Sequence, residues 1–291
     1  MNLNQKDFRI LGAIERLMIT QKYPRTIDLP RETGYSFSYL QKRIEILHKY
    51  NLIETKRKEG EYYEVALKYD GYDALAFNAL VKNGTISGIG QQIGVGKESE
   101  VYLINNDSNK LGILKIHRLG KTKYKSYKKT RNYLAEKHHS SRMYNSRLAA
   151  SNEADILKQT ENLIPVPKIW SHNRHCVVMD YIDGVELFKL KKIELTIFRQ
   201  LYEEIMRIIT VLARNGIIHA DFSPYNILIT INQEKNNFKP YIIDWPQAVN
   251  IKHPNARDFL INDLFNIFTF FGKRIPVPID SLNEIVNDLM K

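Results

Sequence analysis

Residues 217–228 read IIHADFSPYNIL, and the interpretation of the whole chain starts from this segment. It follows an apolar helical pattern and leads into an apolar strand pattern, with Asn226 five positions after Asp221. A carboxylate and an amide oxygen at this spacing suit two tasks, which are to orient an attacking oxygen and to help hold a divalent cation. The segment therefore predicts a catalytic loop in which Asp221 and Asn226 do these tasks and His219 anchors the loop.

A second carboxylate follows at the end of the next apolar strand. Residues 241–246 read YIIDWP, which places Asp244 eighteen residues after Asn226. In kinases an Asp at this place is the second Mg²⁺ ligand, whereas in other proteins it is an ordinary residue at a strand end. Pro246 replaces the usual glycine, and because proline fixes φ and lacks an N–H, we expect no flip of this loop.

Upstream, Lys115 lies between Leu114 and Ile116 in an apolar strand. A buried lysine needs an anionic partner because an unpaired buried charge is costly. The α- and β-phosphates of ATP and a helix glutamate are the natural partners, and Glu153 is the best candidate for that glutamate. The alternative is a surface lysine on an edge strand.

A glycine-containing turn precedes this strand, in the segment IGVGKESEVY at residues 93–102. Glycines 94 and 96 allow backbone N–H groups to approach phosphate closely, and the hydroxyl of Ser99 can donate to a phosphate oxygen. We assign Gly94, Gly96, Lys97 and Ser99 to nucleotide binding, with a plain hairpin as the alternative. The segment lacks the Gly-Lys-Ser/Thr ending of a P-loop.

Residues 177–184, VVMDYIDG, are interpreted as a strand passing into a linker between two lobes. Here adenine would hydrogen-bond to backbone groups of Asp180 and Ile182, with Met179 as the gate. The alternative is an ordinary buried strand.

The order of predicted elements supports this interpretation. From about residue 86 the pattern is first β-rich and then α-rich, which is the plan of protein kinases. We predict strands at 89–94, 100–105, 111–117, 167–170, 175–180, 227–231 and 240–244, and helices at 144–160, 195–215 and 257–272.

The N-terminal residues 1–85 predict a separate winged helix-turn-helix domain with a connector. A helix at 8–18, a short element near Pro30 and a third helix with Leu40, Ile44 and Leu47 on its inner face precede strands at 52–55 and 62–67. Asn51 suits the left-handed residue that ends the third helix. The fold class is therefore α+β, with a winged helix followed by a compact bilobal kinase-like domain at 86–291.

The winged helix would offer basic and aromatic side chains to a nucleic acid, although many winged helices dock proteins instead. The residues expected to be exposed on the third helix and the wing tip are Tyr39, Lys42, Arg43, Lys49, Lys56, Arg57 and Lys58.

The net charge of +11 is concentrated in one stretch. Residues 110–147 hold 12 Lys/Arg and one acid, Glu136, whereas the rest of the chain balances 31 against 31. Such a stretch binds polyanions with strongly salt-dependent affinity, and the interleaved Tyr124, Tyr127 and Tyr133 can stack on exposed bases. We expect RNA contact here; a solvated basic loop without a partner is the alternative.

Composition sets the remaining limits. In 291 residues, of which 43% are hydrophobic, Cys176 is the only cysteine, so an internal disulfide and a cysteine-rich metal site are excluded. The polar start does not resemble a secretory signal, and no apolar run approaches membrane-spanning length. We expect a cytoplasmic monomer without membrane contact, with nuclear presence left open.

Taken together, the motifs resemble those of the RIO atypical protein kinases over nearly the whole chain. The segments that carry the resemblance are residues 94–99, 219–221 and 243–247. The winged helix, Asn173-Arg174-His175 and His253-Pro254-Asn255-Ala256 point to the Rio2 branch.

The resemblance implies an N-lobe at about 86–180, a flexible loop at about 119–145 and a C-lobe at about 184–291 without a peptide-binding activation segment. It also implies ATP and Mg²⁺ as ligands, autophosphorylation of a loop serine (Ser126 lies there), Asp244 as a possible phospho-acceptor, and a pre-small-subunit ribosomal particle with its rRNA as partner. Ala220 and Trp245 depart from the frequent glycine and phenylalanine.

The resemblance implies an ATP- and Mg²⁺-dependent atypical serine/threonine kinase or ATPase switch that acts in maturation of the small ribosomal subunit. Two other functions remain open at this stage. One is a non-catalytic, nucleic-acid-binding winged-helix protein with a kinase-like scaffold, although degenerate kinases usually lose at least one of Lys115, Asp221, Asn226 and Asp244. The other is a small-molecule phosphotransferase, for which the winged helix and the basic stretch have no purpose.

Overall fold

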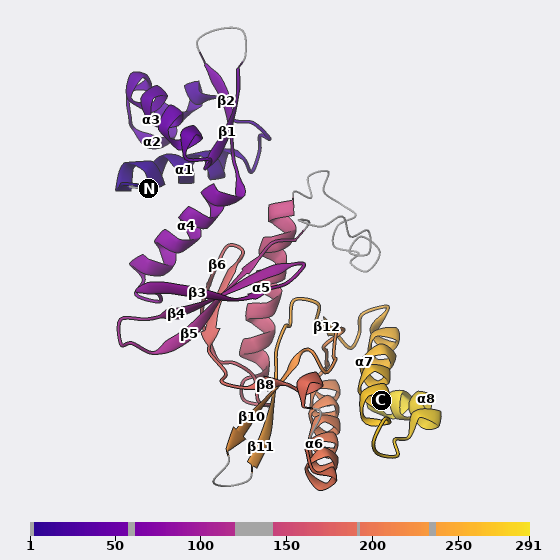
Figure 1. Ribbon diagram of the computed structural model, residues 1–291. Coiled ribbons are helices and arrows are strands. Elements are labelled where there is room, and N and C mark those ends of the chain that lie inside the picture. The colour runs from indigo at the N-terminus through magenta and orange to yellow at the C-terminus, as the bar shows by residue number, and fades with distance from the viewer. Residues whose placement is uncertain (1–2, 58–61, 120–141, 191–192, 233–236) are drawn as a thin grey trace. The chain divides into compact units, whose positions relative to one another are not determined.

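The computed structural model describes residues 3–57, 62–119, 142–190, 193–232 and 237–291. The chain forms two compact units, Met1–Ile86 and Ser87–Lys291, which are described separately below. Figure 1 labels most of the helices and strands of both units. The basic stretch at 110–147, the predicted loop at 119–145 and Ser126 fall largely or wholly outside the described residues, as does Lys58 of the wing tip.

The first unit is built from helices followed by a β-hairpin and a final helix. Its elements are α1 (Gln5–Leu17), a 3₁₀ turn (Thr26–Asp28), α2 (Leu29–Thr33), α3 (Phe37–Lys49), β1 (Ile53–Arg57), β2 (Tyr63–Leu67) and α4 (Tyr69–Lys82). Strands β1 and β2 pair antiparallel, with Ile53 opposite Leu67. Three helices and a hairpin around one core confirm the predicted winged helix.

Local sequence explains how this unit forms. The side chain of Asn4 caps α1, and the Asp7 carboxylate accepts the backbone N–H of Asn4. These reciprocal bonds make a capping box. The predicted inner face of α3 is buried in the core of this unit, which also contains Ile10, Leu11 and Ile14 of α1. Asn51 ends α3 with a φ of 63°, a left-handed conformation that asparagine tolerates well.

Two predictions of exposure on the third helix are wrong. Tyr39 is half-buried and packs against the core of this unit. Arg43 does not stand free for phosphate contact, because its Nε and Nη2 each donate to a carboxylate oxygen of Asp7 at 2.7 Å. The Asp7 side chain is fully buried. Burying a carboxylate requires such a partner, so Arg43 is committed to the fold, whereas Lys42 and Lys49 are exposed.

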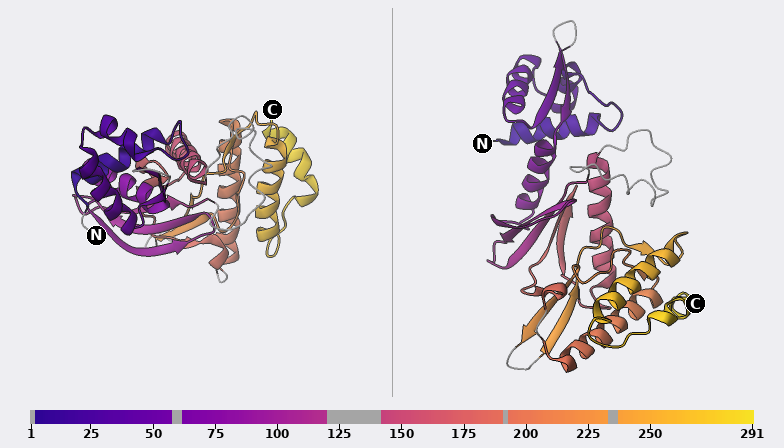
Figure 2. Two further views of the ribbon diagram at one scale, coloured as in Figure 1. Left: turned by 90° about the horizontal axis from the view of Figure 1, so that it is seen from above. Right: turned by 45° about the vertical axis from the view of Figure 1, so that its right-hand side comes forward.

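The second unit opens with a five-stranded antiparallel sheet in the order β3-β4-β5-β7-β6. Its strands are β3 (Gly88–Val95), β4 (Ser99–Asn105), β5 (Leu111–His117), β6 (Ile169–Asn173) and β7 (Cys176–Asp180). Helix α5 (Arg142–Thr160) lies along this sheet and packs against β5, β6 and β7 (Figure 2). All five strands and the helix occur close to their predicted positions.

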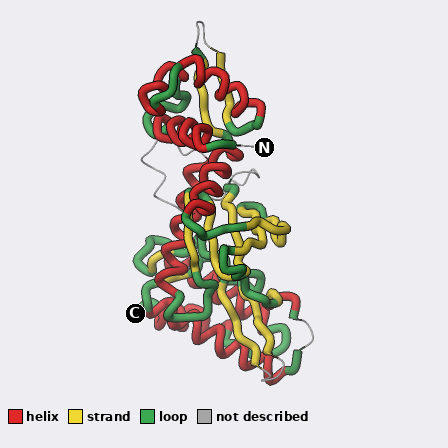
Figure 3. The backbone as a smooth tube through the Cα atoms, turned by 90° about the vertical axis from the view of Figure 1, so that its left-hand side faces the viewer, coloured by secondary structure: helices red, strands yellow, loops and turns green. Residues whose placement is uncertain are grey.

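The C-terminal part of this unit is mainly helical, with short sheets. Its elements are β8 (Val185–Glu186), a 3₁₀ turn (Leu187–Lys189), α6 (Leu195–Arg214), β9 (Ile217–Ile218), β10 (Ile227–Asn232), β11 (Asn237–Ile242), β12 (Val249–Asn250), α7 (Ala256–Phe271), a 3₁₀ turn (Ile279–Ser281) and α8 (Leu282–Leu289). Figure 3 shows the helices in red and the strands in yellow. The predicted α+β class, with a β-rich lobe before an α-rich lobe, is confirmed.

The two lobes of the second unit share one hydrophobic core. Val177 and Met179 of β7 belong to the same buried cluster as Ile227 and Ile229 of β10 and Trp245. Strand β11 ends at Ile242, two residues earlier than predicted, because the backbone turns into a left-handed conformation at Asp244. Across the described parts of the chain, no helix combines the length and apolarity that crossing a bilayer requires.

Candidate active site

Three predicted residues from separate elements meet in the second unit. The Nζ of Lys115 on β5 lies 2.5 Å from Oε1 of Glu153 on α5 and 2.7 Å from Oδ1 of Asp244, which follows β11. Lys115 and Glu153 are almost fully buried, whereas the Asp244 side chain is 40% exposed. The structure thus pairs the lysine with the predicted glutamate and leaves one carboxylate of the cluster open to solvent.

The charges in this cluster support one another. Burial works against the charge on Lys115, but attraction to Asp244 and Glu153 outweighs it and holds the pKa of the ammonium above its ordinary value. Burial likewise disfavours ionised Glu153, yet Lys115 and a hydrogen bond to His117 bring the pKa of Glu153 down to about 2. Both groups are therefore charged at neutral pH.

His117 is a residue of this network that the sequence analysis missed. Its Nε2 lies 2.8 Å from Oε2 of Glu153, and both side chains are buried. The other oxygen of Glu153 also accepts the backbone N–H of Trp245 at 3.2 Å. The signal was available, because residues two apart on a strand face the same side and His117 is two residues after Lys115.

In the predicted catalytic loop, Asp221 and Asn226 are joined directly. The Nδ2 of Asn226 donates to the backbone carbonyl of Asp221 at 2.9 Å and to its Oδ2 at 3.2 Å. This orientation leaves the amide oxygen of Asn226 as the group available to a cation. Burial, with Asp244 as the next cause, raises the pKa of Asp221 to about 6.

Asp263 of α7 anchors this loop and was also missed. Its carboxylate accepts the backbone N–H groups of Ala220 at 2.9 Å and Phe222 at 2.8 Å. These bonds hold Ala220 at a φ of 63°, which is uncommon for a residue with a side chain. Asp263 lies on the same buried helix stripe as Leu260 and Leu264, and an acid in such a stripe signals a specific partner.

His219 is placed as a structural residue, as the sequence analysis proposed. Its Nε2 lies 3.1 Å from the carbonyl oxygen of Ile243, and its ring lies 4.5 Å from that of Trp245. Burial lowers the pKa of His219 to about 4, so the ring is neutral at physiological pH. His219 therefore links the catalytic loop to the segment that carries Asp244.

The segment after β11 has an unusual backbone that several side chains support. Asp244 has a φ of 68°, and the following Trp245 is fully buried. The indole Nε1 of Trp245 donates to the carbonyl of Ile242 at 3.1 Å. The Nδ2 of Asn152, on α5, donates to the carbonyls of Pro246 and Ala248 at 3.0 Å each.

The predicted phosphate-binding residues lie in the hairpin between β3 and β4. Gly96 N–H donates to the carbonyl of Ser99 at 2.8 Å, and Lys97 lies in the turn between them. A Cβ added at Gly94 or Gly96 would meet its nearest protein atom at 3.5 Å, an ordinary contact. The protein's own packing therefore does not require glycine here, which fits a backbone kept bare for a ligand.

At the predicted hinge, Met179 is buried and Ile182 lies in the segment between β7 and β8. The backbone N–H of Asp180 donates to the carbonyl of Lys168 at 2.9 Å, so an adenine contact at Asp180 has to use its carbonyl group. The Asp180 carboxylate accepts bonds at 2.6 Å from Trp170 Nε1 and Lys110 Nζ.

The oxygen ligands that this site offers suit Mg²⁺ together with a nucleotide. Mg²⁺ is usually held by one or two carboxylates plus substrate phosphates and water, which matches Asp244 and the amide oxygen of Asn226. Among the described residues, no group of three His, Cys, Asp or Glu side chains able to hold a metal occurs.

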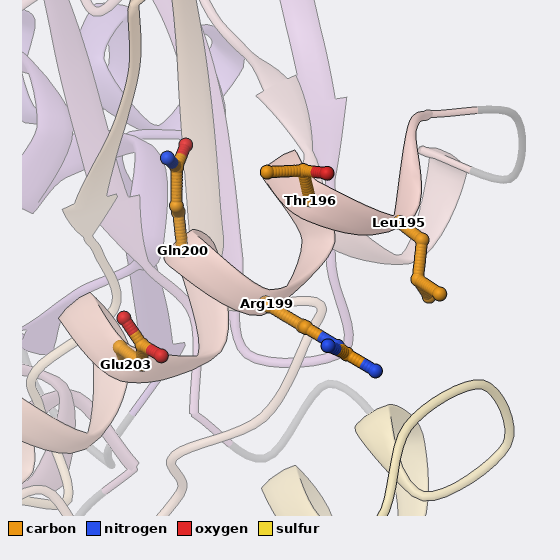
Figure 4. A pocket seen from close by; sticks show the side chains of 5 residues that line it. All are labelled: Leu195, Thr196, Arg199, Gln200 and Glu203. Carbon is orange, nitrogen blue, oxygen red and sulfur yellow. The ribbon is translucent and has the colours of Figure 1, made fainter.

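A shallow surface pocket of about 260 Å³ lies elsewhere, on the first turns of α6 (Figure 4). It is lined by Leu195, Thr196, Arg199, Gln200 and Glu203, none of which is a predicted site residue.

Comparisons with known proteins show the family of this chain. The RIO domain family model matches residues 100–283, and the model "Rio2, N-terminal" matches residues 1–83. Similar curated proteins include serine/threonine-protein kinase rio2 of Dictyostelium discoideum, which is 37% identical over 94% of this chain and 51% of that protein. The rio2 kinase of Schizosaccharomyces pombe is 36% identical over 93% of this chain and 77% of that protein.

An archaeal relative and a solved structure extend the comparison. The RIO-type kinase Rio2 of Methanocaldococcus jannaschii is 38% identical over 72% of this chain and 77% of that protein. The Rio2 kinase–ADP/Mg²⁺–phosphoaspartate complex of Chaetomium thermophilum matches with a TM-score of 0.82 and 32% identity, covering 97% of this chain and 86% of that one. The chain thus spans about half the length of the Dictyostelium relative and more of the others.

Proposed function

The chain belongs to the RIO family of atypical serine/threonine protein kinases, in its Rio2 branch, and on that premise we propose that it is an ATP- and Mg²⁺-dependent kinase or ATPase switch that acts in maturation of the small ribosomal subunit. The observation that carries the catalytic part is the meeting of Lys115, Glu153 and Asp244 at 2.5–2.7 Å. Asp221 and Asn226, which are hydrogen-bonded to one another, supply the catalytic loop.

Each residue has a task in transfer of the γ-phosphoryl group. Lys115 donates to the α- and β-phosphate oxygens, and Glu153 keeps its ammonium in place. Asp221 orients the attacking oxygen and accepts its proton as the new bond to phosphorus forms. Asp244 and Asn226 would hold Mg²⁺, which supplies neutralisation of the charge on the β- and γ-phosphates when bound.

We extend the proposal to Asp244 as a phospho-acceptor. One oxygen of its carboxylate forms a bond to the γ-phosphorus while the bond to the β–γ bridging oxygen breaks, and ADP leaves. Attack by water then releases phosphate and restores the carboxylate, which makes one round of ATP hydrolysis. Two observations support this: the Asp244 side chain is 40% exposed, and the Chaetomium Rio2 complex is described as containing phosphoaspartate.

The catalytic proposal is tested by ATP turnover with Mg²⁺. Asp221→Ala is expected to lose about a hundredfold or more, which corresponds to about 3 kcal/mol of transition-state stabilisation. Asp280→Ala, which removes an exposed carboxylate far along the chain from the site, serves as the control and should keep the wild-type rate. Equal rates for wild type and Asp221→Ala would overturn the proposal.

The proposed partner is the pre-small-subunit ribosomal particle with its rRNA. Support comes from the basic residues of 110–147 other than the buried Lys115 and Arg118, and from the exposed Lys42 and Lys49 of the winged helix. We propose that the protein meets this particle as a cytoplasmic monomer.

A further inference from the structure

One amide side chain of α5 accounts for two of the bonds that hold the segment following Asp244. The Nδ2 of Asn152 donates to the carbonyl oxygens of Pro246 and Ala248, both at 3.0 Å. A carboxamide has two N–H donors, so these bonds use both of them. Within the segment, the N–H of Ala248 donates to the carbonyl of Trp245 at 3.1 Å, which closes a tight turn.

This segment needs external support because of its backbone. Asp244 has a φ of 68°, and a left-handed residue with a side chain persists where its surroundings fix it. Pro246 has no N–H of its own to donate. The carbonyls of Pro246 and Ala248 both accept from the Asn152 amide on α5.

Two consecutive residues of α5 act on this segment from neighbouring positions. Glu153 accepts the N–H of Trp245 at 3.2 Å and also contacts Lys115, as described above. Asn152 contacts the segment one and three residues further along. The two side chains therefore restrain the backbone directly after Asp244, and with it the direction of the Asp244 carboxylate.

We propose that Asn152 is a positioning residue for phosphoryl transfer, which orients Asp244 by fixing the carbonyls of residues 246 and 248. The activity part of this inference rests on the proposed function. A residue that supports a metal ligand from behind affects metal use and the chemical step, whereas binding of the rest of the nucleotide depends on other groups. The test therefore measures the Mg²⁺ requirement and kcat separately from the KM for ATP.

The test compares steady-state ATP turnover over a Mg²⁺ titration for wild type and three variants. Asn152→Ala should raise the Mg²⁺ concentration for half-maximal turnover and lower kcat, each about tenfold, with little change in the KM for ATP. Asn152→Asp, which keeps the shape but has no N–H, should lose at least as much. Asn152→Gln, which keeps both N–H groups, should recover part of the loss.

Ser151→Ala is the matched control, since the hydroxyl of the preceding residue donates to Asp155 on the same helix. It should behave as wild type. Wild-type kcat and Mg²⁺ requirement in folded Asn152→Ala or Asn152→Asp would overturn the inference, as would a lower melting temperature with both parameters unchanged.

A readout without turnover separates this inference from the proposed function. Amide hydrogen exchange should become faster in residues 244–250 of Asn152→Ala and stay unchanged in β10, whereas exchange equal to wild type in both segments would contradict the inference. If wild type binds Mg²⁺ and ADP but shows no ATP turnover, the proposed function fails, and the exchange measurement still decides whether Asn152 holds the segment.

Discussion

Lys115 lies in a buried network whose charges and hydrogen bonds are matched. Its ammonium contacts Glu153 and Asp244, Glu153 is further held by His117, and Asp244 keeps part of its surface in solvent. Removing one member of such a network leaves a buried charge without its partner. This explains why a lysine and a glutamate can be almost fully buried beside an open carboxylate.

The pH dependence of turnover follows from Asp221. Burial and the neighbouring Asp244 raise the pKa of this carboxylate to about 6, and transfer requires its ionised form. Activity should therefore rise with pH through about 6 and level off above about 7. The pH profile of kcat/KM for ATP measures this, because it reports the pKa of the enzyme before the nucleotide binds.

Glu98 allows a test of a lesser electrostatic contribution to the pKa of Asp221, behind burial and Asp244. Its charge contributes to the raised pKa of Asp221, so Glu98→Gln should move the acidic limb of the profile to lower pH. A flat profile between pH 5 and 8 in wild type, or an unmoved limb in Glu98→Gln, would contradict this assignment.

Among the elements, helices α5 and α7 each hold one loop of the site in a left-handed turn. Asp263 on α7 fixes Ala220 in the catalytic loop, whereas Asn152 and Glu153 on α5 fix the segment after Asp244. Asp221 and Asp244 both lie on loops. The rigid helices behind those loops therefore fix the positions of the two carboxylates.

Asp263→Ala tests the first of these anchors. The variant leaves the N–H groups of Ala220 and Phe222 without their acceptor, so the free energy of unfolding should fall by about 2–4 kcal/mol, and turnover should fall as well. Denaturant unfolding and ATP turnover measure the two effects. Asp258→Ala, an exposed acid in the first turn of the same helix, should cost less than about 1 kcal/mol.

An unchanged catalytic rate in folded Asp263→Ala would show that the loop keeps its geometry without this carboxylate. The free energy of unfolding of Asp263→Asn should lie between those of wild type and Asp263→Ala. The reason is that an amide offers one acceptor oxygen, whereas the carboxylate uses two.

In the winged helix, the pair between Arg43 and Asp7 connects α3 to the capping box of α1. Arg43→Ala should leave Asp7 buried without its cation and lower the free energy of unfolding of the first unit by about 3 kcal/mol or more. Lys42→Ala, at the neighbouring exposed position, is the control.

The two tryptophans, Trp170 and Trp245, both lie in the second unit. Circular dichroism should therefore detect the shifted transition of Arg43→Ala, while the tryptophan fluorescence transition and ATP turnover should stay unchanged. A joint shift of both transitions would contradict the separate cores.

Elements and site residues differ in how far the sequence alone predicts them. Strong periodicity and turn residues place β3–β5, α5 and α6 close to their observed bounds, and motif spacing identifies Asp221 and Asn226. The partners of Arg43, Asn152 and Asp263 depend on which distant segments pack together, across 36 to 96 residues of chain. No local pattern encodes such pairings, so one of them was predicted wrongly and two were missed.

At the scale of the whole molecule, the chain combines two independent cores with charge gathered in one stretch. The residues outside 110–147 balance 31 basic against 31 acidic groups, so that stretch accounts for the net charge of +11. Binding to RNA through such a stretch is driven by counterion release and falls steeply with salt.

Replacing Lys121, Lys123, Lys125, Lys128 and Lys129 with Gln should therefore weaken RNA binding and reduce the slope of log K against log salt by roughly 3 to 5. Filter binding to small-subunit rRNA across a salt series measures this. Gln at Lys189 and Lys291, each of which pairs with an acid three residues away, is the control. A slope equal to wild type in the five-site variant would exclude this stretch as the RNA contact.

The most direct test of the account is a crystal structure of the full chain with Mg²⁺ and ADP. We predict Mg²⁺ at about 2.1 Å from a carboxylate oxygen of Asp244 and from the amide oxygen of Asn226, with Lys115 on the phosphates. A nucleotide bound away from these side chains, or Asp221, Asn226 and Asp244 turned away from one another around it, would contradict the account.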